Sequence, residues 1–174
     1  MRREAGLTLV ELLVAIAVLG VLLSICVPAF GNFAVDSRLA SATNRFVSAI
    51  HLARSEAVRR NARVTLCPSM DGVFCASGGD WDQGWIVFSD LDGTGERDSG
   101  EPILAVGQSI SGGVKITGNM PVRNYISYVG LGATRRANGA LQMGTVTLCS
   151  GTEGRQIIIS RTGRPRVQQG GCDT

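Results

Sequence analysis

The sequence is poor in the side chains from which catalytic and metal sites are most often built. Its 174 residues include one histidine, His51, one lysine, and only 5% aromatic residues. Neither a Gly-x-Ser-x-Gly nucleophile motif nor a Walker-type phosphate loop occurs. No Cys-x-x-Cys pair is present, which disfavours a structural zinc site. Because no catalytic constellation emerges, we expect a chain that is not an enzyme and carries no cofactor. Its carboxylates are numerous enough that composition does not by itself exclude a paired-carboxylate hydrolase.

Charge is almost absent from one long segment near the N-terminus. Between Leu7 and Phe30 only Glu11 is charged, and an apolar run of about 20 residues is long enough to cross a bilayer. Two arginines precede the run and no basic residue follows until Arg38, which predicts a cytoplasmic N-terminus and a periplasmic or extracellular remainder. A carboxylate inside such a segment costs roughly 2.5–3.5 kcal/mol, so Glu11 needs a partner unless it reaches water at the helix end.

A small residue stands before this run, whereas a secretory signal peptide carries its small-residue cleavage site after the run. The order Gly6-Leu7-Thr-Leu-Val-Glu11 resembles the class III leader of type IV pilins and pseudopilins, with Leu7 in place of the usual Phe. The resemblance implies that a prepilin peptidase cuts between Gly6 and Leu7 and that Leu7 is then N-methylated. It also implies that Glu11 guides assembly by pairing with the N-terminal amine of a neighbouring subunit, and that Pro28 bends the helix.

Helical periodicity continues past the apolar run. Apolar residues recur at helical spacing from position 39 to 57, arginines occupy the other face, and Asn61 is a predicted helix stop. One helix from Leu7 to about Asn61 would be roughly 80 Å long. The expected organisation is a leader (1–6), a transmembrane and assembly helix (7–30), its amphipathic continuation (31–61) and a β-rich domain (62–174).

Beyond Asn61 the pattern changes to short β-type runs, separated by turns rich in the chain's 23 glycines. No second helical pattern interrupts them, so the sheets should be antiparallel. The predicted fold class is α+β, with one long N-terminal helix packed on antiparallel sheets, the pilin-like arrangement that the resemblance also implies. Strands are predicted at 64–67, 85–90, 103–106, 114–117, 125–129, 140–149, 156–160 and 166–168.

The five cysteines divide by position. Cys26 lies in the apolar segment and is expected to act as a small apolar residue. The other four lie in the part expected in an oxidising compartment, which favours two disulfides. Three pairings are possible, and the local one joins Cys67 to Cys75 and Cys149 to Cys172.

Two internal segments indicate which branch of the pilin-like proteins the chain resembles. Gly84-Trp-Ile-Val-Phe-Ser-Asp90 and Ala53-Arg-Ser-Glu-Ala57 resemble elements of the GspH/FimT branch of pseudopilins. Within that branch the alternatives are a DNA-binding minor pilin of the FimT kind and a FimU-like or GspH-like subunit. The latter would prime or cap a pilus or a type II secretion pseudopilus without touching DNA.

The C-terminal region carries an excess of positive charge. Residues 102–174 hold eight basic and two acidic residues, which favours an anionic partner. Thr162-Gly163 indicates a turn between two strand-like runs, which would place Arg161, Arg164 and Arg166 around a hairpin tip. Pro165 implies an edge strand. Two arginines two residues apart on a strand lie roughly 6.5–7 Å apart, a spacing that suits neighbouring phosphates.

A solvated basic turn would explain the charge pattern as well. However, Gly163-Arg164-Pro165-Arg166 also resembles the Gly-Arg-x-Arg motif of FimT-like minor pilins, which bind DNA during natural transformation. The resemblance implies DNA contacts by Arg164 and Arg166, and the hairpin geometry adds Arg161. Other basic residues could widen the patch: Lys115, Arg123, Arg135 and Arg136. The expected partners are DNA, other pilin subunits, a prepilin peptidase and the bacterial inner membrane, with the β-rich domain periplasmic and later extracellular in the pilus.

An acidic segment leaves a second question open. Asp90-x-Asp92-x-Thr94-Gly95-x₅-Glu101 has the spacing of an EF-hand calcium loop except for Thr94 at the fifth position. The flanking runs predict strands instead of helices, and an acidic glycine-rich hairpin explains the same residues. The sequence alone assigns no metal ligand here.

Overall fold

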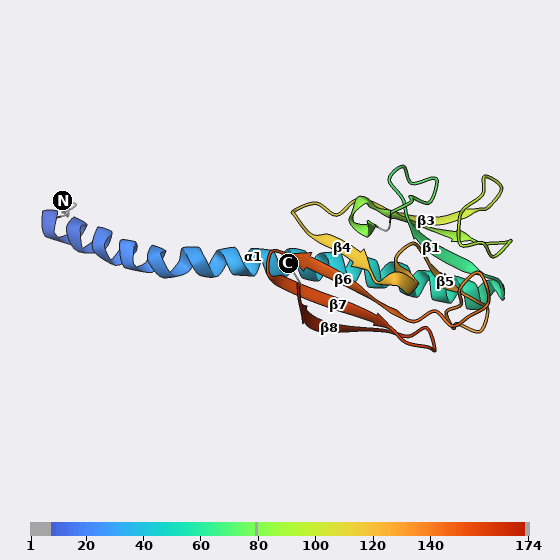
Figure 1. Cartoon of the computed structure of the whole chain (residues 1–174). Coiled ribbons are helices and arrows are strands. Elements are labelled where there is room, and N and C mark those ends of the chain that lie inside the picture. Colours follow the sequence, from blue (N-terminus) through green and yellow to red (C-terminus); the bar gives the residue numbers. More distant parts are fainter. Residues whose placement is uncertain (1–7, 79, 173–174) are drawn as a thin grey trace. The chain divides into compact units, whose positions relative to one another are not determined.

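The computed structural model describes residues 8–78 and 80–172, and for residues 25–30 and 32 it describes only the backbone. The longest element is helix α1, Leu9–Arg60, of 52 residues (Figure 1). It begins with a capping box: Thr8 Oγ1 accepts from the Glu11 N–H at 3.3 Å, and Glu11 Oε2 accepts from the Thr8 N–H at 2.9 Å. Glu11 thus has a local partner that the sequence analysis did not anticipate.

The predicted stop at Asn61 is confirmed. Asn61 has a positive φ of 47°, and the Ala62 N–H donates to the Ala57 carbonyl at 3.2 Å. This is the Schellman closure of a helix, in which a left-handed residue turns the last amides back onto free carbonyls. Asparagine tolerates that backbone conformation better than most residues do.

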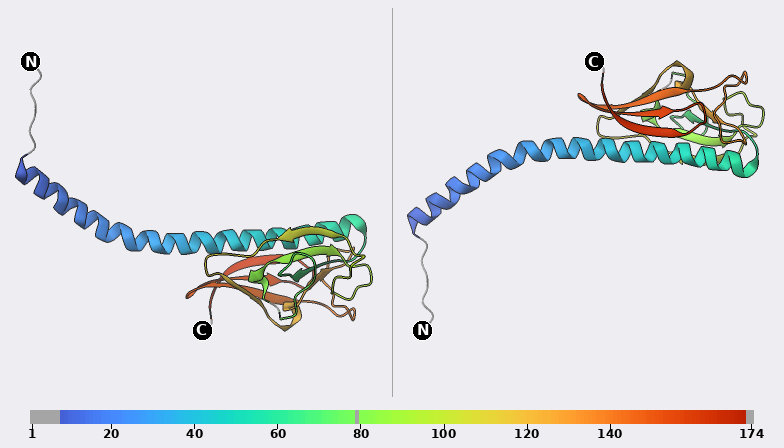
Figure 2. Two further views of the ribbon diagram at one scale, coloured as in Figure 1. Left: turned by 90° about the horizontal axis from the view of Figure 1, so that it is seen from above. Right: turned by 90° about the horizontal axis from the view of Figure 1, so that it is seen from below.

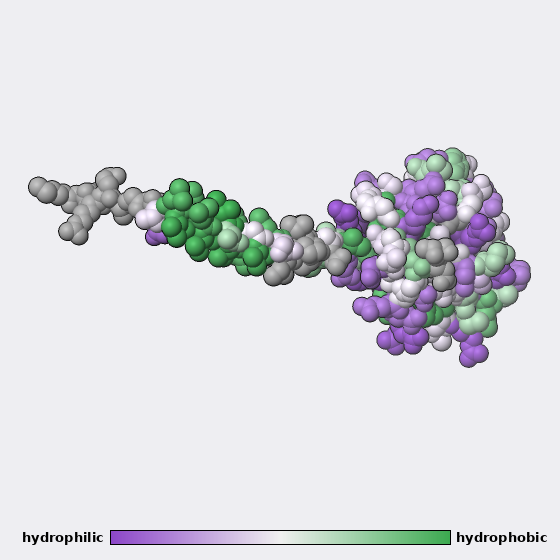
Figure 3. Space-filling model, turned by 60° about the vertical axis from the view of Figure 1, so that its left-hand side comes forward, coloured by the Kyte–Doolittle hydropathy of each residue, from purple (hydrophilic) through white to green (hydrophobic). Residues whose placement is uncertain are grey.

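The chain forms two compact units, Met1–Ser37 and Arg38–Thr174. In the first, the apolar side chains of α1 are largely exposed, for example Leu13 at 59% and Val21 at 63% (Figure 3). Within the described residues, no helical segment combines the length and the sustained hydropathy that crossing a bilayer requires. The helical backbone is continuous through Pro28, whose side chain, like that of Cys26, lies outside the described part.

The second unit contains two antiparallel four-stranded sheets. The first has the order β3-β2-β1-β5, formed by Ile103–Gly107, Trp85–Ser89, Val64–Pro68 and Ile126–Tyr128. The second has the order β4-β6-β7-β8, formed by Lys115–Gly118, Gly144–Ser150, Glu153–Ile159 and Pro165–Gly171. Two short 3-10 helices, η1 (Trp81–Gln83) and η2 (Met120–Val122), lie in the connections. The α+β prediction is confirmed.

The largest difference from the predicted strand bounds lies at the start of the run 140–149. The run 140–149 becomes strand only from Gly144, because Gln142 is buried in a loop and not in a ladder. Its Oε1 accepts from the Ser127 N–H, and its Nε2 donates to the carbonyls of Pro121 and Tyr125. These three bonds tie the loop to β5 and satisfy a buried amide.

The core of this unit forms where α1 meets both sheets, and Figure 2 shows the second half of α1 running along one side of them. The apolar stripe of the helix, from Leu39 to Ala57, is buried there. Phe46 lies at its centre with edge-to-face contacts to Trp81 and Trp85, each with ring centroids 5.1 Å apart. The helical spacing of small and large apolar residues is what allows one helix to cover two sheets.

Two disulfides close the domain, and both follow the local pairing. Cys67 at the end of β1 is joined to Cys75, and Cys149 on β6 is joined to Cys172 after β8. The second bond attaches the C-terminal end of the outermost strand to a central strand of the same sheet.

Candidate functional site

The C-terminal arginines lie on a β-hairpin at the edge of the second sheet. Strands β7 and β8 pair from Ile159↔Pro165 to Glu153↔Gly171, and β8 has no strand on its other side within the described residues. This confirms the edge strand predicted from Pro165, since proline cannot donate to a second ladder.

The turn of this hairpin is held by local and tertiary contacts. The Gly163 N–H donates to the Ser160 carbonyl at 2.9 Å, and the Arg164 N–H donates to Ser160 Oγ at 3.2 Å. Gly163 is buried with φ +75°, and a Cβ there would lie 2.6 Å from the Gly132 carbonyl oxygen. Only glycine therefore suits this position, both for its backbone conformation and for the close approach.

Tyr128 anchors the same turn from the first sheet. Its hydroxyl donates to the Gly163 carbonyl at 2.8 Å, and its side chain is fully buried. Burial raises the pKa of Tyr128, an effect that the nearby Arg54 opposes. The hydroxyl therefore stays protonated as a donor at physiological pH, and the tip of the hairpin is fixed to the body of the domain.

Arg161, Arg164 and Arg166 lie on the surface, with Arg161 and Arg164 flanking the turn and Arg166 on β8. Within the described part of the chain, none of the three forms an ion pair or a side-chain hydrogen bond. The end of α1 is different: Arg59 and Arg60 both bind Glu56, at 2.6 and 2.7 Å, and their hydrogen bonds lower the pKa of that carboxyl to about 2. The hairpin thus presents positive charge that the domain itself does not neutralise.

The register places Arg166 on the outer face of the second sheet. It lies opposite Ile158, whereas Ile157 and Ile159 point into the core. The same face carries a row of polar residues at paired positions: Thr117, Thr147, Gln156 and Gln168. Lys115 shares this face, since it precedes the buried Ile116, but it lies on β4 at the opposite edge of the sheet.

The remaining candidate basic residues are not part of the hairpin. Arg123 and Arg136 line a separate cavity of about 410 Å³ beside η2, together with Tyr125. Arg135 is half-buried, and its Nη1 atom is buried without a hydrogen-bond partner in the described structure. The lining of that cavity includes no residue of the hairpin, and the idea that these three residues widen the patch stays a prediction.

Arg54 is a basic residue of α1 whose position near the hairpin the sequence analysis did not predict. A Cβ on Gly132 would lie 3.3 Å from Arg54 Nε. The carbonyl oxygen of Gly132 in turn lies next to Gly163, 2.6 Å from the position of a Cβ there. A guanidinium from α1 thus approaches the base of the hairpin turn. No sequence spacing indicates this, because the contact joins residues of three distant segments.

The residues predicted for processing and assembly are only partly described. Gly6 and Leu7 lie outside the described residues. Glu11 has its Oε2 atom engaged by Thr8, and within the described residues its Oε1 atom accepts no hydrogen bond.

Comparison with known proteins agrees with these features. The chain matches the family model "Type II transport protein GspH" over residues 42–163 and the "Prokaryotic N-terminal methylation motif" over residues 1–27. The pilin-like protein PilA1 of Thermus thermophilus is 32% identical over 173 residues, covering 94% of this chain and 97% of PilA1.

Two solved structures share the fold. The type IV minor pilin FimU of Pseudomonas aeruginosa has a TM-score of 0.59 at 20% identity, covering 78% of this chain and 92% of FimU. The minor pseudopilin EpsH of the Vibrio cholerae type 2 secretion system has a TM-score of 0.51 at 9% identity, covering 76% of this chain and 97% of EpsH.

Proposed function

The chain belongs to the GspH family and is a minor type IV pilin or pseudopilin, and on this premise we propose that it binds DNA through Arg161, Arg164 and Arg166. The observation that supports this most is the hairpin: three surface arginines, without ion-pair partners among the described residues, on a turn fixed by Tyr128 and Gly163. The GspH family match ends at residue 163, so the proposal for Arg164 and Arg166 depends on the hairpin and not on the family match.

We further propose how the subunit reaches a fibre. The apolar half of α1 anchors the precursor in the inner membrane with the domain in the periplasm, and a prepilin peptidase cuts between Gly6 and Leu7. The Thr8 amide survives that cleavage, so Glu11 Oε2 can still cap its own helix while Oε1 pairs with the N-terminal amine of a neighbouring subunit. Pairing of this kind would offset the cost of a carboxylate in an apolar bundle.

DNA binding at this hairpin would be directed at the phosphate backbone. Guanidinium groups bind phosphate oxygens in bidentate geometry, and the described part of the site offers neither a recognition helix nor a row of aromatic side chains for base stacking. Binding should therefore be insensitive to sequence, weak for one subunit and strongly weakened by salt. Retraction of the fibre by a separate motor protein would then carry the bound DNA towards the cell, as in natural transformation.

The double substitution Arg164→Ala with Arg166→Ala is expected to weaken duplex binding by about tenfold or more, because two charge-assisted contacts are lost. The slope of log K against log salt should fall by about 2, roughly one for each phosphate contact. Fluorescence anisotropy with a labelled duplex and the full-length chain in detergent, over a salt series, measures both quantities.

The matched control removes the same charge elsewhere. Arg38→Ala with Arg123→Ala leaves the hairpin intact and should keep most of the affinity. Equal binding by the two double variants would rule out the hairpin as the site. Absence of binding by the wild type would instead favour the structural alternative, a subunit that primes or caps the fibre without DNA.

A further inference from the structure

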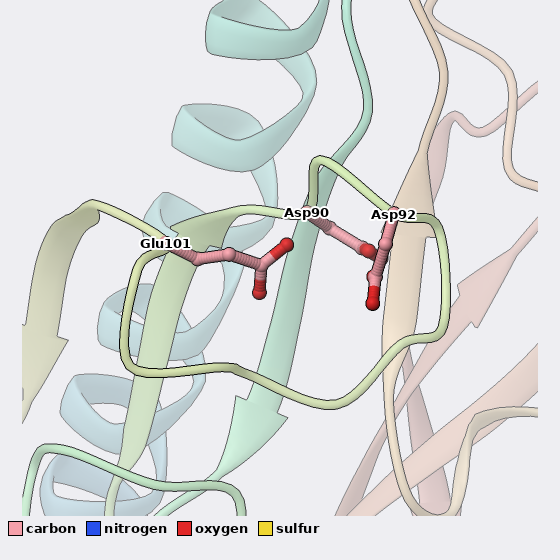
Figure 4. A group of neighbouring side chains, drawn as sticks. All are labelled: Asp90, Asp92 and Glu101. Carbon is pink, nitrogen blue, oxygen red and sulfur yellow. The ribbon is translucent and has the colours of Figure 1, made fainter.

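The loop between β2 and β3 gathers three carboxylates that the proposed function does not use. Asp90 follows the end of β2, Asp92 lies two residues on, and Glu101 precedes β3. Figure 4 shows the side chain of Asp90 pointing toward Asp92, with the Glu101 carboxyl extending toward them from the other side of the loop. One oxygen from each lies within 4.8 Å of the others. Like charges at this separation repel unless a proton or a cation lies among them.

One oxygen atom of Asp90 has no hydrogen-bond donor or cation beside it in the described structure. The residue is only 2% exposed. Its Oδ2 atom accepts from Thr65 Oγ1 at 2.6 Å and from the Gly95 N–H at 3.2 Å, whereas its Oδ1 atom is buried with no hydrogen-bond partner in the described structure. A buried carboxylate oxygen without a donor is rare in native proteins, and a bound ion or water is one physical explanation for it.

The nearest cationic side chain does not supply that partner. Arg63 contributes a favourable charge to Asp90, but its Nη1 atom donates to Ser127 Oγ and to the carbonyl of Arg135. Within the described residues, Asp90 forms no ion pair within 4.0 Å.

Two more oxygens lie beside the carboxylates. Thr94 Oγ1 donates to the Glu96 carbonyl at 3.1 Å, and the Thr94 N–H donates to Asp92 Oδ1 at 3.1 Å. Asp90, Asp92, Thr94, the Glu96 carbonyl and Glu101 occupy positions 1, 3, 5, 7 and 12 of a twelve-residue loop, which are ligand positions of calcium loops. Every candidate ligand is a hard oxygen, which suits Ca²⁺ and disfavours zinc or copper.

We propose that residues 90–101 bind one Ca²⁺ ion, with Asp90 Oδ1, Asp92 and Glu101 as charged ligands and Thr94 Oγ1 and the Glu96 carbonyl as neutral ones. Glu101 already accepts backbone N–H groups from Leu91 and Asp98, and a carboxylate oxygen has a second lone pair for the ion. Flanking strands replace the helices of an EF-hand, so the ion closes the β2–β3 connection and moves no helix. The expected affinity is that of extracellular calcium modules, a Kd of roughly 10⁻⁴–10⁻³ M.

Tb³⁺ luminescence and thermal unfolding test the site directly. The ring of Tyr125 lies over Gly95, 3.1 Å from the position of a Cβ, so Tb³⁺ bound in the loop should show sensitised emission when tyrosine is excited. Excess Ca²⁺ should quench that emission. With the full-length chain in detergent, Ca²⁺ well above Kd should raise Tm by about 5 °C or more, reversibly with EDTA.

Asp92→Asn is the test variant, because Asp92 is exposed and the change should leave the fold intact. It should lose both the Tb³⁺ emission and the Ca²⁺-dependent rise in Tm. Asp71→Asn is the control: Asp71 is also exposed and accepts backbone N–H groups in a loop outside residues 90–101, and it should behave as the wild type. An equal rise in Tm with Mg²⁺, no response of the wild type, or an unchanged response of Asp92→Asn would each overturn the proposal.

Discussion

Replacing Phe46 with alanine is expected to lower the free energy of unfolding by roughly 4–6 kcal/mol. Phe46 is fully buried and makes edge-to-face contacts with Trp81 and Trp85. The substitution leaves a cavity where α1 meets the sheets and removes both aromatic contacts. Because all three rings lie together, the helix cannot move in to fill the space without displacing the two indoles.

Urea unfolding followed by tryptophan fluorescence measures this effect, since both tryptophans are buried next to the site. Phe33→Ala is the matched control: it removes the same ring from the same helix, but Phe33 is 69% exposed and lies in the first unit. It should change stability by less than about 0.5 kcal/mol. If the two variants lowered the free energy of unfolding by the same amount, the aromatic cluster around Phe46 would not be what stabilises the packing of the helix.

Gly163→Val is expected to destabilise the domain by roughly 3–5 kcal/mol and to abolish DNA binding while leaving every arginine in place. Gly163 has φ +75°, and its Cβ would lie 2.8 Å from Tyr128 Cε1 as well as 2.6 Å from the Gly132 carbonyl. The turn must move away, which breaks the Tyr128 hydrogen bond and leaves a buried hydroxyl unpaired. Arg161 and Arg164 then lose their fixed positions.

Gly151→Val is the control variant, because it introduces the backbone strain of a positive φ without the steric clash found at Gly163. Gly151 also has a positive φ, of 61°, in the turn between β6 and β7, but nothing lies within 4 Å of its Cβ position. It should cost about 1–2 kcal/mol and leave DNA binding unchanged. Thermal unfolding and anisotropy titration, carried out below the Tm of each variant, measure the two effects. Wild-type affinity in the Gly163 variant would show that a fixed turn is not needed.

The site was only partly predictable for a physical reason that Arg164 and Arg54 illustrate. Arg164 lies between a turn signal and a proline that are close to it in the chain. The placement of Arg164 and its neighbours on an edge hairpin therefore depends on local backbone rules. Arg54 reaches the same turn through Gly132, across long separations in the chain. Helical periodicity placed Arg54 on the polar face of α1 but carries no information about which loop lies opposite.

The acidic loop, residues 90–101, was likewise only partly predictable from the sequence. Its spacing fitted both a calcium loop and a plain hairpin, and the strands on either side removed neither alternative. The observation that favours the calcium proposal is the buried side chain of Asp90. Its Oδ2 atom accepts from Thr65 on β1, whereas its Oδ1 atom has no hydrogen-bond partner in the described structure. Burial of this kind depends on the packing of several strands, and local spacing cannot supply it.

The sequence by itself determined the pilin-like class, the long helix with its end at Asn61, the antiparallel sheets and the edge hairpin, because each depends on periodicity or on residues close in the chain. The tertiary structure alone decided how one helix covers two sheets around Phe46, which basic residues accompany the hairpin, and that Asp90 is buried. The physical reason is that these features arise from contacts between distant segments. Their geometry is fixed only when the whole domain is packed.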